Sequence, residues 1–243
     1  MANVLQYAID TYGSHLSLIL LFSISLIIAS VIPLFAAFPT YSDMGGIFIR
    51  NASIFYNVTP LTAALIVFST VFSLLFFSFG IVAINVVVKH KRTYSRIKKE
   101  VINGLERYTA KVFAILLLFT AVIILLDILS YMYSIPFYTI AVIGLVLTPL
   151  FFYAPSSIVI DDNGILRSMK ASVKHFFKRL DYVGLWLIIA IVLLTALDFI
   201  FIGIAGISLS RYVLLIVNAL FVLPFLILLQ SECYLRRFGL LKG

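Results

Sequence analysis

Residues 61–88 read LTAALIVFSTVFSLLFFSFGIVAINVVV without a single charged side chain, and the chain then continues directly into Lys89-His-Lys-Arg92. A bilayer core about 30 Å thick is crossed by about 20 apolar residues in a helix, so this stretch is long enough to span it. Lipid cannot satisfy the polar groups of an open backbone, and a helix satisfies them internally. The stretch therefore predicts a membrane-spanning helix that ends in a cationic loop.

Five other stretches have the same character on either side of it. The six predicted spans are residues 16–38, 61–88, 112–133, 137–160, 183–207 and 212–230. Hydrophobic residues make up 63% of the chain and charged residues 12%, whereas soluble domains have roughly half and a quarter. We therefore predict an all-α, polytopic bundle of six transmembrane helices with interfacial amphipathic helices, forming a single integral membrane domain over residues 1–243.

The positive charges fall in alternate loops between these spans. Of the 18 Lys and Arg residues, all except Arg50 and Arg211 lie in the second loop, the fourth loop or the C-terminal tail. Cationic loops remain on the cytoplasmic side of a membrane. This distribution predicts a multi-pass protein of the plasma membrane with both termini cytoplasmic. The sequons at Asn51 and Asn57 then fall in the first external loop, where glycosylation would find them.

The first external loop, residues 39–60, is itself rich in apolar side chains. They recur at a seven-residue interval as Ile47, Phe48, Ile54 and Phe55. This pattern favours a short helix that lies in the outer membrane interface. A re-entrant element that turns at Gly45-Gly46 is the alternative.

Two of the cationic loops have the pattern of basic amphipathic helices. In the second loop, one helical stripe holds Tyr94, Ile97, Val101, Leu105 and Tyr108. The fourth loop repeats the pattern between residues 165 and 180. The cations on the other faces form a predicted basic cytoplasmic face made of Arg96, Lys98, Lys99, Lys170, Lys174 and Lys178.

Anionic lipid headgroups of the bilayer are the expected partners of this basic face. Other membrane subunits with acidic surfaces are alternative partners, and so is a nucleic-acid backbone, which nothing else in the sequence supports. His175 lies among the cations of the fourth loop, and we expect it to be solvated because no second histidine has a metal-ligand spacing. No metal site and no cofactor are predicted.

The fourth loop also contains Asp161-Asp-Asn-Gly164, followed by Ile-Leu-Arg-Ser168-Met-Lys-Ala-Ser172. A glycine turn before a helix with hydroxyl residues resembles a motif of poorly characterised six-span membrane protein families. It also resembles the membrane domain attached to some glycerophosphodiester phosphodiesterases. Gly164, Ser168 and Ser172 match this motif. The resemblance implies a shared membrane fold, and it carries over no catalytic residue because this sequence contains no phosphodiesterase domain.

Three polar residues, Asp127, Asp198 and Asn218, lie inside predicted spans at similar depths. Each is about 10–12 Å below the outer boundary at a rise of 1.5 Å per residue. Ionisable groups inside spans cost at least ~3 kcal/mol, so they need partners. The favoured interpretation is hydrogen bonding between helices, or pairing with Arg50 or Arg211. The alternative hypothesis is a proton or cation site, in which two neighbouring carboxylates raise one pKa.

Proline and small residues predict local features of the spans. Pro149 and Pro155 interrupt the fourth span and favour a kink there. The pairs Ser25 with Ala29 and Ser69 with Ser73 have the spacing that permits two helices to approach closely.

No motif for an enzymatic reaction is found in the sequence. A P-loop, a nucleophile elbow, a zinc-protease helix, a paired-cysteine motif and a dinucleotide fingerprint are all missing, and Cys233 is the single cysteine. We therefore expect a non-enzymatic scaffold or subunit of a membrane assembly that acts through its basic cytoplasmic loops. The alternative is a transporter or channel for ions, small solutes or polymers that uses the polar intramembrane layer.

Overall fold

The computed structural model describes residues 2–35, 40–43, 46–49, 59–90 and 97–236. In chain order, the elements are α1 (Ala2–Ser14), α2 (Leu16–Phe35), β1 (Thr40–Asp43), β2 (Gly46–Ile49), α4 (Pro60–His90), α5 (Ile97–Met132), α6 (Phe137–Phe151), α7 (Ala154–Asp161), α8 (Ile165–Lys178), α9 (Leu180–Val217), the π-helical turn η1 (Asn218–Val222) and α10 (Leu223–Leu235). Apart from the short pair β1–β2, every one of these elements is helical. The predicted all-α class is confirmed.

Six stretches of these helices are long and apolar enough to cross a membrane. They are Leu16–Pro33, Pro60–His90, Lys98–Ser130, Val142–Asp161, Leu180–Phe201 and Val213–Leu235. Each overlaps one of the six predicted spans. By the length and composition of its helices, the chain is a multi-pass membrane protein.

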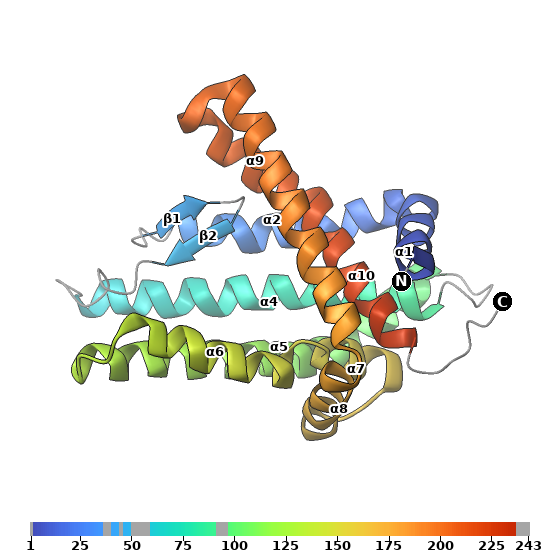
Figure 1. The fold of residues 1–243 in the computed structure, drawn as a ribbon, viewed down its shortest axis with the longest axis horizontal. Coiled ribbons are helices and arrows are strands. Elements are labelled where there is room, and N and C mark those ends of the chain that lie inside the picture. The colour runs from blue at the N-terminus through green and yellow to red at the C-terminus, as the bar shows by residue number, and fades with distance from the viewer. Residues whose placement is uncertain (1, 36–39, 44–45, 50–58, 91–96, 237–243) are drawn as a thin grey trace.

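The helices α2, α4, α5 and α6 lie side by side, and α9 runs obliquely across them (Figure 1). The core lies toward the C-terminal end of α4, where residues 80–88 are all buried. Around them pack α5, α7 and α10, and α1 packs against α10 in turn. We call this the basic end of the bundle. The end of α4 and the first part of α5 carry Lys89, Lys98, Lys99, Arg107 and Lys111 here, and α8, which packs on α7, carries Lys170, Lys174 and Lys178.

The approach of α2 and α4 confirms the prediction from small residues. Ser73 Oγ donates a hydrogen bond to the carbonyl oxygen of Ala29 at 2.6 Å. A Cβ atom added to Gly80 would lie 2.5 Å from the side chain of Leu26, which is itself buried. Small residues on the facing sides, Ser73 opposite Ala29 and Gly80 opposite Leu26, therefore permit the close approach of the two helices.

The α9 stretch contains a reversal of chain direction (Figure 1). The indole N–H of Trp186 donates to the carbonyl oxygen of Leu226 at 2.8 Å, which brings together residues 40 positions apart. Between the two arms, Ala190, Val222 and Leu226 form a small buried cluster. The predicted loop between the fifth and sixth spans is thus built from helical residues.

Two predicted interfacial helices differ from the structure. In the first loop, β1 and β2 pair antiparallel with Thr40 opposite Ile49, so the expected helix is wrong at Ile47 and Phe48. Antiparallel pairing of the two strands satisfies their backbone polar groups without a helix. The remaining residues of that prediction, Ile54 and Phe55, lie outside the described residues.

The second-loop helix is the beginning of the third span. α5 continues unbroken from Ile97 to Met132, and Val101 and Tyr108 are buried in the core that α5 shares with α4. A Cβ atom on Gly104 would lie 2.6 Å from the side chain of Val86. The described part of the apolar stripe, Val101, Leu105 and Tyr108, therefore contacts protein, and the expected separate helix is the beginning of α5.

Sequence analysis also missed α1. Its buried residues Val4, Ala8 and Thr11 follow helical spacing, but two of them are small and one is polar, so the apolar signal is weak. Thr11 Oγ1 donates to the carbonyl oxygen of Tyr7 at 2.6 Å, which satisfies the hydroxyl within the helix.

Candidate functional site

The fourth span is broken where α6 ends and α7 begins. Pro155 has no N–H, and its ring displaces the carbonyl of the preceding turn, so a regular helix cannot continue through it. Tyr153 is the residue before α7, with φ −97° and ψ 0°. The break leaves backbone polar groups that need partners inside a largely buried segment.

Two side chains from other helices satisfy these groups. Ser172 Oγ, on α8, donates to the carbonyl oxygen of Pro149 at 2.7 Å and accepts from the N–H of Tyr153 at 2.9 Å. Gln230 Nε2, on α10, donates to the carbonyl oxygen of Phe152 at 2.5 Å. The break is therefore fixed from both sides, and Ser172 of the predicted motif has a structural role.

The inner face of α8 is polar. Ser168, Ser172 and His175 recur at steps of four and three, and all three are buried. His175 Nε2 lies 3.3 Å from the carbonyl oxygen of Cys233. Its ring meets Tyr153 and Tyr234 edge-on, with centroids 4.8 Å and 5.2 Å away. The expectation of a solvated histidine is wrong, because this face packs on α6 and α7.

The turn before α8 joins three helices. Asp162 adopts the left-handed conformation at φ 57°, and its carboxylate accepts a hydrogen bond from Arg107 of α5. Lys111 Nζ lies 3.9 Å from the other oxygen of the same carboxylate. Tyr234 of α10 donates its hydroxyl to Asp161 at 2.5 Å. The turn is thereby held against both α5 and α10.

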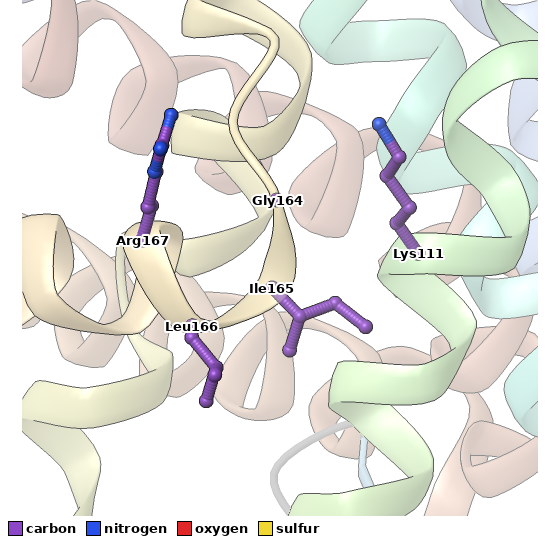
Figure 2. Close-up of a pocket in the computed structure, with 5 residues that line it drawn as sticks. All are labelled: Lys111, Gly164, Ile165, Leu166 and Arg167. Carbon is purple, nitrogen blue, oxygen red and sulfur yellow. The ribbon is translucent and has the colours of Figure 1, made fainter.

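A pocket of about 480 Å³ opens beside this turn, between α5 and the start of α8 (Figure 2). It is lined by Lys111, Gly164, Ile165, Leu166 and Arg167. Figure 2 shows the side chains of Lys111 and Arg167 extending to one side, with Ile165 and Leu166 extending to the other. The pocket therefore has a cationic wall and an apolar wall.

The predicted basic face is only partly in the described residues. On α8, Lys170, Lys174 and Lys178 recur every four residues and are all exposed. At the start of α5, Lys98 and Lys99 are exposed as well, whereas Arg96 lies outside the described residues.

The α8 lysines lie on the side of the helix opposite its buried serines. None of the three forms an ion pair with a residue in the described parts of the chain. Beyond the end of α8, a hydrogen bond to Asp181 holds the pKa of Arg179 above its usual range. The outer face of α8 is therefore a row of cations that other parts of the described structure do not neutralise.

The predicted polar layer is distributed over two parts of the bundle. Asp127 lies on α5, which packs on α4, α6 and α7. Asp198 lies on α9 and Asn218 begins η1, and these two segments pack on each other. Asn218 is 6% exposed. The sequons at Asn51 and Asn57 lie outside the described residues.

Comparison with known proteins gives no family assignment: no family model, no curated protein and no solved structure matches the chain. The resemblance to six-span families carried by Gly164, Ser168 and Ser172 stays a prediction. Within the described residues, no group of three or more His, Cys, Asp or Glu side chains is placed to hold a metal ion.

Sequence analysis missed the pocket and the buried polar contacts between helices. Ser231 Oγ donates to Asn85 Oδ1 at 2.7 Å, and both residues are almost completely buried. Arg107 and Lys111 were counted as cations, but their shared contact with Asp162 depends on the path of the turn. The sequence feature that could have indicated this contact is the Asp-Asp-Asn-Gly turn, because a tight turn can place its side chains against a neighbouring helix.

Proposed function

We propose that this protein is a non-enzymatic subunit or scaffold of a membrane assembly, and that it contacts anionic partners through the basic end of the bundle. The observation that supports this most directly is the division of α8 into two faces. On the buried face, Ser172 and His175 fasten the helix to the protein through their polar contacts, and Ser168 is buried beside them. The exposed lysines on the opposite face remain free to meet a partner.

The polar side chains at this end serve to connect helices. Ser172 joins α8 to the break in the fourth span, Ser231 joins α10 to α4, and Tyr234 joins α10 to the turn before α8. Such contacts favour one fixed arrangement of the helices, because a buried polar group left unpaired costs about 1–3 kcal/mol. A rigid platform with a cationic surface suits an assembly role.

The test is purification of the full chain from its native membranes in mild detergent. Replacing Lys170, Lys174 and Lys178 together by Gln removes the row of charge, and replacing the same three by Arg is the matched control. We expect associated proteins to be recovered with the wild type and the Arg variant and to be lost with the Gln variant. Recovery of a lone monomer from all three preparations would refute the proposal.

The proposed orientation places this end in the cytoplasm of a plasma-membrane protein. Lys98→Cys and Lys174→Cys can be labelled separately in intact cells with a membrane-impermeant reagent, because the natural Cys233 is buried. We expect both positions to be protected in intact cells and labelled after permeabilisation. Labelling of the two positions from opposite sides would overturn the topology.

A transporter or channel is the second candidate, and the π-helical turn that begins at Asn218 favours it. Such turns are rare and occur frequently at functional sites. The test is proton or cation flux in liposomes with Asp127→Asn, Asp198→Asn and Asn218→Ala. A wild-type flux that any of these variants abolishes supports transport through the polar layer. An equal flux in all of them refutes the use of this layer, and no flux above that of empty liposomes refutes transport.

A further inference from the structure

We infer that the pocket between α5 and α8 binds the phosphate group of an anionic phospholipid. Lys111 and Arg167 hold the headgroup, while Ile165 and Leu166 contact the adjoining acyl region. This inference deepens the proposed function and rests on it in one respect, since it uses the same basic end of the bundle. The two can nevertheless fail separately, because their tests alter different residues.

The charges around the pocket leave it cationic. Arg107 donates to the carboxylate of Asp162 and so neutralises it, and Lys111 lies on the far side of the same carboxylate at 3.9 Å. Arg167 is exposed and has no ion pair in the described parts of the chain. With Asp161 of the same turn, which accepts from Tyr234 of α10, three cations stand against two carboxylates and leave a net positive charge for a ligand. Ammonium and guanidinium groups form strong charge-assisted hydrogen bonds with phosphate.

The shape of the pocket matches an amphiphile better than a free anion. The nitrogen-bearing ends of Lys111 and Arg167 flank the backbone at Gly164, and the apolar side chains of Ile165 and Leu166 extend in the opposite direction from them (Figure 2). Leu166 is 75% exposed, so its apolar surface is available to a ligand or to lipid. A Cβ atom on Gly164, which lines the pocket, would meet nothing within 4 Å, so no side chain is packed against this part of the turn.

The position of the pocket along α5 also indicates a lipid. Lys111 is the last charged residue before residues 112–126, which carry no charge at all and belong to a membrane-crossing stretch. The side chain of Lys111 therefore lies at the level where the apolar span meets the headgroup region. Lysine and arginine side chains near span ends characteristically place their charge at this level. A volume of about 480 Å³ accommodates a phosphate together with its glycerol backbone.

The experiment is native mass spectrometry of the full chain in detergent, titrated with phosphatidylglycerol and, separately, with phosphatidylcholine. The variant Lys111→Gln/Arg167→Gln removes the two pocket cations. The surface-charge control, Lys170→Gln/Lys174→Gln, removes two exposed cations of the basic face on the same helix outside the pocket, and so measures what surface charge alone contributes to lipid binding. We expect the pocket variant to lose phosphatidylglycerol affinity by at least about tenfold, the control to lose clearly less, about threefold, and phosphatidylcholine to bind weakly to all.

Two further arms separate the sources of the phosphate. Inorganic phosphate at the same concentration is expected to displace little lipid, and Leu166→Gln is expected to weaken phosphatidylglycerol binding by about threefold. Equal losses in the pocket variant and the control would overturn the inference, because they would indicate diffuse attraction to surface charge. Full displacement of the bound lipid by inorganic phosphate would also overturn the inference. So would a pocket variant that loses a protein partner while its lipid binding is unchanged. Lipid loss with partners retained would leave the assembly proposal standing.

Discussion

Replacing Ser172 by Ala removes the hydroxyl that bridges the break in the fourth span. Ser172 is fully buried and holds two backbone groups, the carbonyl of Pro149 at 2.7 Å and the N–H of Tyr153 at 2.9 Å. If each hydrogen bond contributes the ~0.6 kcal/mol typical inside membrane proteins, the free energy of unfolding falls by about 1 kcal/mol. If both backbone groups remain without water and unpaired, it falls by about 4 kcal/mol. We expect the variant to lose about 2 kcal/mol of unfolding free energy.

The matched control is Ser168→Ala, one turn earlier on the same face of α8. Ser168 is equally buried, but its hydroxyl has no hydrogen-bond partner among the described residues, so removing it is expected to cost nothing or to stabilise slightly. Unfolding in mixed detergent micelles can be followed by the fluorescence of Trp186, the single tryptophan. Its ring lies edge-on to Phe152 at the break, with centroids 5.1 Å apart. Equal stability of the two variants would refute the bridging role of the Ser172 hydroxyl.

Three further predictions concern other contacts. Gly80→Ala is expected to lower the free energy of unfolding by about 1–3 kcal/mol, because the new Cβ would meet the side chain of buried Leu26. In Gly184→Ala the new Cβ would meet nothing within 4 Å, so this control is expected to stabilise the protein slightly. Unfolding of both variants in detergent measures the two effects. Trp186→Phe is expected to cost about 1 kcal/mol through the lost bond to α10, and unchanged unfolding by circular dichroism would contradict it. Burial raises the pKa of the Tyr12 hydroxyl to about 12, whereas the same group titrates at about 10 in the unfolded chain. The contribution of the neutral Tyr12 side chain to the free energy of unfolding is therefore fully present below about pH 10 and is lost as the pH rises toward 12. Alkaline absorbance titration of Tyr12→Phe against wild type is expected to show the missing transition near pH 12.

The helices of this fold were predictable because lipid restricts the choice of structure. An uncharged stretch such as 61–88 has one stable conformation in a bilayer, so its length and composition are sufficient for the prediction. The close approach of Ser73 to α2 was predictable for a similar reason, since small residues at regular spacing have few other uses in a span. In both cases, the information is local in the sequence.

The helix α8 shows where local information is insufficient. Its sequence has an apolar pattern and a cationic pattern, and both suggested a helix lying on the membrane surface. Which residues of that helix are buried depends on the surfaces of α6, α7 and α10 against which it packs. The break between α6 and α7 leaves backbone groups without helical partners, and a serine can hydrogen-bond to them whereas a leucine cannot. This is why Ser172 and His175 are buried while Leu166 and Phe177 are exposed.

The same reasoning applies to the candidate site. The pocket exists because Asp162 turns the chain in a left-handed conformation and its contact with Arg107 draws the start of α8 toward α5. Each residue alone reads as an ordinary surface charge, and only the turn gives Lys111 and Arg167 a common pocket. Removing Arg107 should therefore weaken ligand binding even though Arg107 does not line the pocket, since Asp162 would then be free to neutralise Lys111. Charge reversal at Arg107 that left phosphatidylglycerol affinity unchanged would show that Arg107 is not needed to keep Lys111 available for a ligand.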